Sequence, residues 1–237
     1  MNQARDPLYR RHRFPAEVTG YAVWLYFRFP LSLRMVEEML AARGIGVSHE
    51  SVRHWAEKFG REFSNRIRRC APPRGDKWHM DEVVVTIRGK KHWLWRAVDQ
   101  NGFVLDVLVQ SRRDRTAARR LMRKLLRMSA AAPRVMVTDK LKSYGAARTD
   151  MGLRFEHRQH KGLNNRAENS HLPTRRRERL MKRFKSPRQV QKFLSIHDQV
   201  ANLFHLPRNK FSAIDYRAAR TKAFSAWAEI AAAPLAA

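Results

Sequence analysis

The chain contains one cysteine, Cys70, among its 237 residues. A single cysteine can build neither an internal disulfide framework nor a zinc site that depends on several thiolates. Disulfide-rich secreted proteins are therefore excluded as a class, and a reducing, intracellular setting is favoured.

Long apolar segments are also missing. No run approaches the ~20 residues that cross a bilayer, and the N-terminal segment MNQARDPLYRRHRF lacks the apolar core of a signal peptide. We therefore expect a cytoplasmic protein without a membrane partner.

Acidic residues are scarce, because 21 Asp and Glu stand against 49 Lys and Arg, and the formal net charge is +28. A surface this basic indicates a polyanionic partner, with nucleic acid ahead of an anionic membrane. The alternative is a ribosome-associated or nonspecifically adhesive basic protein. Hydrophobic residues make up 43% of the chain and charged residues 30%, as in a globular protein rather than a disordered one.

The first sixty residues show three helical patterns. Apolar residues recur at helical spacing in 18–25, 33–40 and 52–59, and the segment ARGIGVS, with Gly44 and Gly46, separates the second pattern from the third. Such an order describes a helix-turn-helix module or, by spacing alone, any small helical bundle. The net charge favours DNA binding. The candidate DNA-binding residues of the third helix are Ser48, His49, Ser51, Arg53 and His54.

A change of pattern follows the proline- and glycine-containing segment RRCAPPRGDK, which predicts a linker within 61–77. Beyond it, MDEVVVTIRGKKHWLWRAVDQNGFVLDVLVQ predicts three antiparallel strands. A basic amphipathic helix at about 114–128, a strand at 134–138, a strand near RFEHR and a helical region from about 165 come next. By analogy, this is the order of a ribonuclease-H-like α/β domain with a mixed sheet and flanking helices.

Two acids stand in line with apolar residues of predicted strands. Alternation places Asp81 on the more apolar face of the first strand and Glu82 on the more polar face. Asp139 shares a face with Val135 and Val137 at the end of another strand. Taken singly, each aspartate also fits a residue that caps a turn or the next helix.

A third acid, Glu168, lies in LNNRAENSH. By itself it fits a surface glutamate that pairs with Arg166 or Arg175. Three carboxylates brought within ~4 Å would repel one another by roughly 4 kcal/mol per pair at an effective dielectric constant near 20. Divalent cations remove this penalty, and two such ions can activate an attacking oxygen and stabilise a leaving one in phosphodiester chemistry.

Three blocks, WHMDE, VTDKLKSYG and EHRQHKGLNNRAENSH, resemble those of the DDE transposases of bacterial insertion-sequence family six. The segment from FPAEV to VRHWAEKF is similar to the helix-turn-helix region of the same family, so the resemblance covers roughly residues 14 to 205. The resemblance implies that Asp81, Asp139 and Glu168 are the catalytic residues and the metal ligands. It also implies a ribonuclease-H-like core and Mg²⁺, with Mn²⁺ as a substitute.

The resemblance further implies the reaction and the partners. Transposases of this family cleave the terminal inverted repeats of their element to 3′-hydroxyls, which attack target DNA. We therefore expect double-stranded DNA as the partner, a homodimer or a higher assembly on paired ends, and a nucleoid-associated place in a bacterial cytoplasm.

Two features depart from the family pattern. Asp139 and Glu168 are 29 positions apart, which is shorter than the commoner spacing, and Pro173 predicts a kink in the helix after Glu168. Arg175 matches the basic residue that usually follows the glutamate by seven positions, and Lys140 follows Asp139 directly. Both are further DNA-binding candidates.

The sequence thus predicts a metal-dependent DNA transposase. We expect a helix-turn-helix module with a basic N-terminal arm in 1–65, the catalytic domain in 75–205 and a C-terminal helical tail in 206–237. One alternative is a catalytically inert DNA-binding regulator of transposition. Another is a nuclease of the same fold without joining activity.

Overall fold

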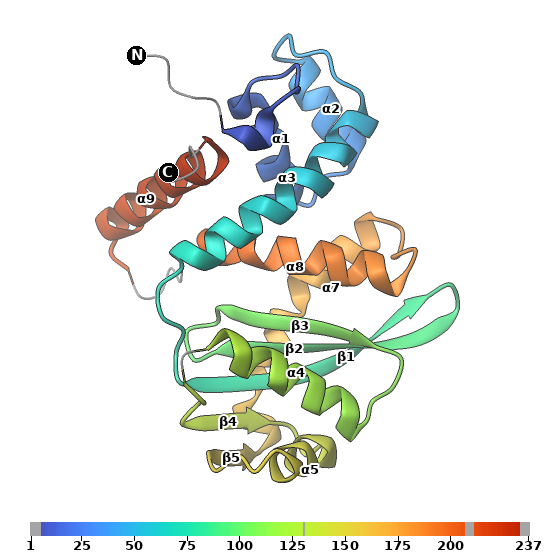
Figure 1. Ribbon diagram of the computed structural model, residues 1–237, viewed down its shortest axis with the longest axis vertical. Coiled ribbons are helices and arrows are strands. Elements are labelled where there is room, and N and C mark those ends of the chain that lie inside the picture. The colour runs from blue at the N-terminus through green and yellow to red at the C-terminus, as the bar shows by residue number, and fades with distance from the viewer. Residues whose placement is uncertain (1–5, 130, 207–210, 233–237) are drawn as a thin grey trace. The chain divides into compact units, whose positions relative to one another are not determined.

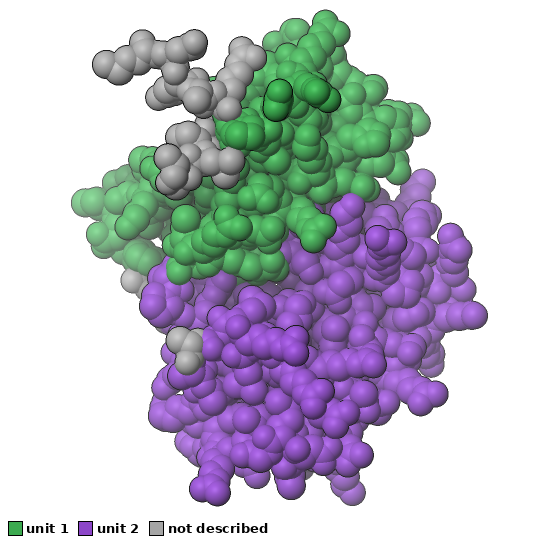
Figure 2. All heavy atoms as spheres, viewed as in Figure 1, with its two compact units in different colours: residues 1–71, 199–237 green, residues 72–198 purple. Residues whose placement is uncertain are grey.

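The computed structural model describes residues 6–129, 131–206 and 211–232 (Figure 1). The chain divides into two compact units (Figure 2). Unit 1 combines Met1–Ala71 with Gln199–Ala237, and unit 2 is Pro72–Asp198. Within the described ranges, no helix combines the length and the hydropathy that a membrane span requires.

Unit 1 is helical. Two serine hydroxyls cap its second and third helices: Ser32 accepts from the main-chain N–H of Met35, and Ser48 accepts from that of Ser51. The helices are η1 (Pro7–Tyr9, a 3-10 helix), α1 (Ala16–Arg28), α2 (Leu33–Ala41), α3 (His49–Cys70) and α9 (Ala213–Ala232). The three helical patterns of the sequence correspond to α1, α2 and α3.

Helix α3 is longer than predicted. Its buried face continues through Phe59, Phe63 and Ile67, and the helix ends at Cys70, directly before Ala71 and Pro72. Pro72 ends the helix, because the residue that precedes a proline is disfavoured in the helical region of backbone conformation. The linker expected within 61–77 is therefore reduced to the few residues between α3 and the first strand.

The segment predicted as a C-terminal tail, 206–237, contributes α9 to unit 1, and its residues 207–210 and 233–237 lie outside the described residues. Helix α9 packs against α1 and α3, with the Trp227 ring edge-on to that of Phe63 at 5.4 Å between centroids. A Cβ atom added at Gly20 of α1 would lie 2.8 Å from the Cβ of Ala231, so this close approach of α1 and α9 requires glycine.

Unit 2 is built on a five-stranded sheet with the order β3-β2-β1-β4-β5. The first three strands form two antiparallel hairpins, whereas β4 runs parallel to both β1 and β5. This order and these directions confirm the ribonuclease-H-like arrangement. The strands are β1 (Lys77–Ile87), β2 (Lys90–Asp99), β3 (Val104–Gln110), β4 (Val135–Thr138) and β5 (Glu156–Gln159).

Helices connect and cover the sheet (Figure 1). The long helical region predicted from 165 is interrupted at His171, and Pro173 occupies the first turn of the next helix, where its missing N–H costs no hydrogen bond. The kink predicted at Pro173 is thereby confirmed. The helices are α4 (Arg115–Met128), α5 (Lys142–Asp150), η2 (Lys161–Leu163, a 3-10 helix), α6 (Asn165–Ser170), α7 (Leu172–Leu180) and α8 (Pro187–Leu203), whose residues from Gln199 onward belong to unit 1.

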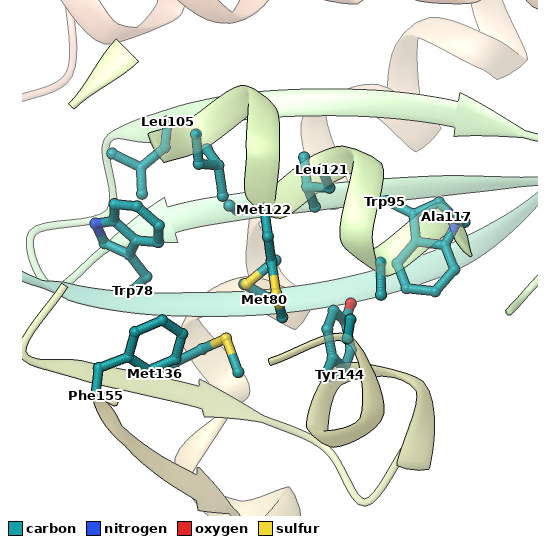
Figure 3. Close-up of a cluster of buried hydrophobic side chains, with 14 residues drawn as sticks. Trp78, Met80, Trp95, Leu105, Ala117, Leu121, Met122, Met136, Tyr144 and Phe155 are labelled. Atoms are coloured by element: carbon teal, nitrogen blue, oxygen red, sulfur yellow. The ribbon is translucent and has the colours of Figure 1, made fainter. Parts of the chain in front are cut away.

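The main core of unit 2 lies between the sheet and helices α4 and α5 (Figure 3). Trp78 and Met80 of β1 and Trp95 of β2 meet Leu121 and Met122 of α4 there, and all five are at most 2% exposed. Full burial of such side chains contributes roughly 1.5–3 kcal/mol each. Because alternate residues of a strand point to opposite faces, the odd-numbered residues of β1 point away from this core, toward the face on which α6 lies.

Candidate active site

The register of β1 against β4 brings two of the predicted acids to neighbouring positions. The parallel pairing ends with Met80 opposite Thr138, so Asp81 and Asp139 are the next residues of the two strands. Paired residues of parallel neighbours point to the same face of a sheet. Asp81 is buried and Asp139 is half-buried.

The third acid, Glu168, lies on α6, which packs against β1 and β2. The fully buried Asn164 precedes this helix, and its Nδ2 donates a hydrogen bond to the carbonyl oxygen of Met80 over 2.9 Å. Glu168 is one turn further and exposed. It forms no ion pair within the described part of the chain, and Arg175 instead pairs with Glu178 over 3.0 Å.

Protein groups hold the two aspartates. His171 Nε2 lies 3.4 Å from Asp81 Oδ2, within ion-pair distance but without hydrogen-bond geometry. Asp139 Oδ1 accepts from the main-chain N–H of Leu141 over 2.9 Å, and its Oδ2 lies 3.5 Å from Arg113 Nη2. Burial lowers the pKa of His171, and Asp81 opposes this change only in part.

The donor chemistry of these three carboxylates fits a hard divalent cation, which prefers oxygen ligands. Among the residues that the structure describes, however, no three His, Cys, Asp or Glu side chains are gathered into a group that could hold a metal ion. The register thus brings Asp81 and Asp139 to neighbouring positions, and Glu168 lies on α6 without forming a group with them.

Glu82 lies on a different kind of surface from the one that the sequence predicts. It was expected on the polar face of β1, but its side chain is fully buried on the face covered by α5. The Tyr144 hydroxyl donates to Glu82 Oε2 over 2.6 Å, and Arg113 Nε donates to Oε1 over 2.7 Å. The expectation was wrong because helices cover both faces of β1, which alternation within one strand cannot reveal.

Burial raises the pKa of Glu82 to about 7, although the hydrogen bonds from Tyr144 and Arg113 act in the opposite direction. Arg113 also stacks on the Trp93 ring, 5.0 Å from its centroid. Arg113 contacts both the buried Glu82 and Asp139, so it connects the two carboxylates. The position of Tyr144 within the block VTDKLKSYG was the one signal in the sequence for this group.

A buried arginine fixes the junction between α6 and α7. Arg96 of β2 is 1% exposed, and it donates to the carbonyl oxygen of Ser170 over 3.1 Å and to Thr174 Oγ1 over 2.7 Å. Its Nη2 also lies 3.2 Å from Oδ2 of the buried Asp198 on α8. Burial raises the pKa of Asp198, but Arg96 and His197 outweigh that effect, so the pKa falls below its ordinary value.

Three other acids of the domain have structural roles. Asp99 accepts from the N–H groups of Asn101 and Phe103 in a turn, and Asp114 caps α4. Asp106 pairs with Lys124 over 2.8 Å.

The candidate DNA-binding residues of α3 surround its N-terminus. Ser48 is the helix cap, and its hydroxyl also bonds that of Ser51. His49 lies between two glutamates, and Arg53 pairs with Glu50 over 3.2 Å. His54 is exposed, as is Lys140 beside the aspartates of unit 2. Contact with DNA stays a prediction for all of these residues.

Comparison with known proteins places the chain in a family. A family model described as a DDE domain matches residues 75–206. The transposase for insertion sequence element IS257 in transposon Tn4003 of Staphylococcus aureus is 29% identical over 168 residues, which cover 69% of this chain and 75% of that protein. The transposase for the insertion sequence-like element IS431mec of Staphylococcus aureus strain N315 matches with the same identity and coverage.

Solved structures of viral integrases also match. The catalytic core domain of HTLV-2 integrase, in complex with magnesium, is 17% identical, with a TM-score of 0.39 over 58% of this chain and 89% of that chain. The catalytic core domain of BIV integrase is 12% identical, with a TM-score of 0.38 over 63% and 99%. Because the DDE-domain model covers more than half of the sequence and the relatives are transposases, the chain belongs to the DDE transposases of bacterial insertion-sequence family six.

Proposed function

We propose that this transposase cleaves the ends of its own insertion sequence to 3′-hydroxyls and joins them to target DNA. The observation that carries the proposal is the position of Asp81 and Asp139, each of which directly follows the last pair of β1 with β4, Met80 and Thr138, while the helix of Glu168 is docked on β1 through Asn164. Rigid strands fix the first two carboxylates, and a short helix presents the third.

Asp81 and Asp139 would hold two divalent cations as shared or flanking ligands, and Glu168 would be the third ligand. When bound, these ions activate the attacking oxygen and stabilise the leaving oxygen of the phosphodiester. The oxygen-only donor set favours Mg²⁺, with Mn²⁺ as a substitute. A cation would offset the repulsion between the gathered carboxylates, which is roughly 4 kcal/mol per pair.

The other groups of the site position DNA in this proposal. Arg175 and the exposed Lys140 would contact phosphates near the carboxylates, and the N-terminal part of α3 would recognise the terminal inverted repeat. A homodimer or a larger assembly would hold two element ends together. These partner assignments rest on family membership and on the net charge of +28.

The test is a joining assay with a labelled duplex that carries the native element's end, a supercoiled target and Mg²⁺ or Mn²⁺. The wild type should give a joined product that requires metal, and Asp139→Asn should abolish it while DNA affinity is retained. Asp150→Asn, which removes a carboxylate of α5 paired with Arg115 of α4, is the matched control and should join normally.

Two results would contradict the proposal. Binding of verified paired ends without cleavage or joining would identify a catalytically inert regulator. Cleavage without a joined product would identify a nuclease of the same fold.

A further inference from the structure

A groove runs between the outer part of β1 and helix α7 in unit 2. β4 pairs with β1 only as far as Met80, so beyond that residue β4 does not cover this edge of β1. Val84 and Thr86 line one side of the groove, and residues of α7 and of the turn after it line the other. The groove has a volume of about 520 Å³.

The lining of this β1–α7 groove is strongly basic. Arg175, Arg179, Lys182 and Arg183 face a single carboxylate, Glu178. Glu178 pairs with Arg175, whereas the other three cations are exposed and form no ion pair within the described ranges. Sites for small organic ligands are mostly apolar, so this lining fits an extended anion that stays partly in solvent.

The turn that carries two of these cations has an unusual backbone. Lys182 and Arg183 have φ values of 49° and 72°, in the left-handed region that favours glycine. Main-chain hydrogen bonds from Lys182 to Arg179 and from Arg183 to Glu178 hold the turn. Two consecutive positions at which glycine would relieve backbone strain are thus occupied by long basic side chains. Backbone strain that is not relieved in this way is concentrated at functional sites.

The groove lies at a defined distance from the aspartate of β1. Val84 and Thr86 follow Asp81 by three and five residues, roughly 10 and 17 Å along a strand. By alternation their side chains point to the other face of β1, so the groove reaches the strand at the edge that β4 leaves open. One strand of a DNA duplex advances about 3.4 Å per nucleotide. The groove is therefore within reach of phosphates about three to five nucleotides from a phosphodiester held at Asp81.

We propose that the β1–α7 groove binds the phosphodiester backbone of the DNA strand, about three to five nucleotides from the scissile phosphate. The inference rests on the proposed function for the identity of the anion and for the location of the cleaved bond. Arg179, Lys182 and Arg183 supply the binding charge. Glu178 weakens binding, because it neutralises Arg175 and repels phosphate.

The first experiment measures the affinity of the full-length protein for a labelled duplex with the native element's end, over a series of salt concentrations. Arg179→Gln combined with Arg183→Gln should lower affinity on the order of tenfold, and the slope of log K against log salt should shrink by about 1.8, or ~0.9 per lost contact. The matched control combines Arg123→Gln with Arg127→Gln, two exposed arginines of α4. It removes the same charge and should leave the slope unchanged.

A second pair of variants tests the role of Glu178. Glu178→Gln should strengthen DNA binding, whereas Asp150→Asn, which also removes a carboxylate paired with an arginine, should have no effect. Opposite effects of the groove arginines and the groove glutamate would not follow from misfolding, because a misfolded protein loses affinity in both cases.

Neutral methylphosphonate links in the duplex test the location. A link about three to five nucleotides from the cleavage point should weaken binding by the wild type but not by the arginine variant. Equal salt slopes for the arginine variant and the wild type, an equal loss in the α4 control, or no positional effect of the neutral links would overturn the proposal. These measurements need no catalysis, so a wild type that binds through the groove but fails to join DNA would contradict only the proposed function.

Discussion

Asn164 Nδ2 donates a hydrogen bond to the carbonyl oxygen of Met80 over 2.9 Å, and this contact joins the start of the Glu168 helix to the residue before Asp81. Both residues of the pair are fully buried. A helix of six residues has little stability of its own. Its position relative to β1 therefore depends on tertiary contacts such as this hydrogen bond.

Replacement of Asn164 by alanine should loosen this connection. The variant leaves the carbonyl of Met80 without its donor, which should cost roughly 1–3 kcal/mol of unfolding free energy. Joining activity should fall by more than the loss of folded protein accounts for, because Glu168 loses its fixed position. DNA affinity should remain unchanged. Urea unfolding and the joining assay measure the two effects. Asn169→Ala, an exposed change on the same helix, should alter neither.

Replacement of Arg96 by methionine should destabilise unit 2 strongly. Asp198 would keep its contact with His197 but would lose its buried cation, and removal of one partner from a buried ion pair costs about 3–5 kcal/mol. The double variant Arg96→Met with Asp198→Leu removes both charges and should recover a large part of this loss. Guanidinium unfolding of the single and double variants gives the coupling energy, and strictly additive losses would contradict the pairing.

Glu82 should make the stability of the metal-free protein depend on pH. Its pKa rises from an ordinary value of 4.5 to about 7 in the folded chain. Between these values, the folded chain keeps a proton on Glu82 that the unfolded chain has released, so stability falls as pH rises through this window. The full difference corresponds to about 3 kcal/mol.

The test compares wild type with Glu82→Gln by urea unfolding in the presence of a chelator, at several pH values across this window. The variant cannot release the proton, so its stability relative to the wild type should increase by about 3 kcal/mol from the acid end to the basic end of the window. A constant difference between the two proteins would show that Glu82 titrates normally.

Substitutions at the N-terminal part of α3 should reduce recognition of the element end. Arg53→Ala combined with His54→Ala removes two exposed side chains, and loss of base contacts costs roughly 1–3 kcal/mol each. Affinity for the native end should fall by at least about 30-fold, whereas affinity for a scrambled duplex, which is held through phosphates, should change less. An equal loss on both duplexes would assign the two residues to backbone contacts.

The sequence predicted those features that depend on local pattern. Periodicity located the helices and strands, and the position of Asp81 and Asp139 in apolar strands marked them before any pairing was known. Pro173 correctly marked the break in the helical region. These features depend on residues that are neighbours in the sequence.

The features that were missed depend on pairings between distant residues. Glu82 meets Arg113 and Tyr144 only because α5 folds over β1, and Arg96 meets Asp198 only because α8 returns to the sheet. From alternation within one strand, the face that carries a charged residue is predicted to be exposed to solvent. In the central strands of α/β sheets, however, both faces are commonly buried. An arginine inside the apolar segment WLWRAV was the available signal for the second pairing.

The most direct test of the central claim, that the aligned aspartates hold the metal, is a change of ligand at Asp139. In Asp139→Cys a thiolate replaces a carboxylate, and sulfur is a poor ligand for Mg²⁺ but a more acceptable one for Mn²⁺. The account predicts that the variant joins element ends only with Mn²⁺, whereas the wild type joins them with either ion. Joining by the cysteine variant with Mg²⁺ at the wild-type rate would show that Asp139 does not contact the metal, and would contradict the account.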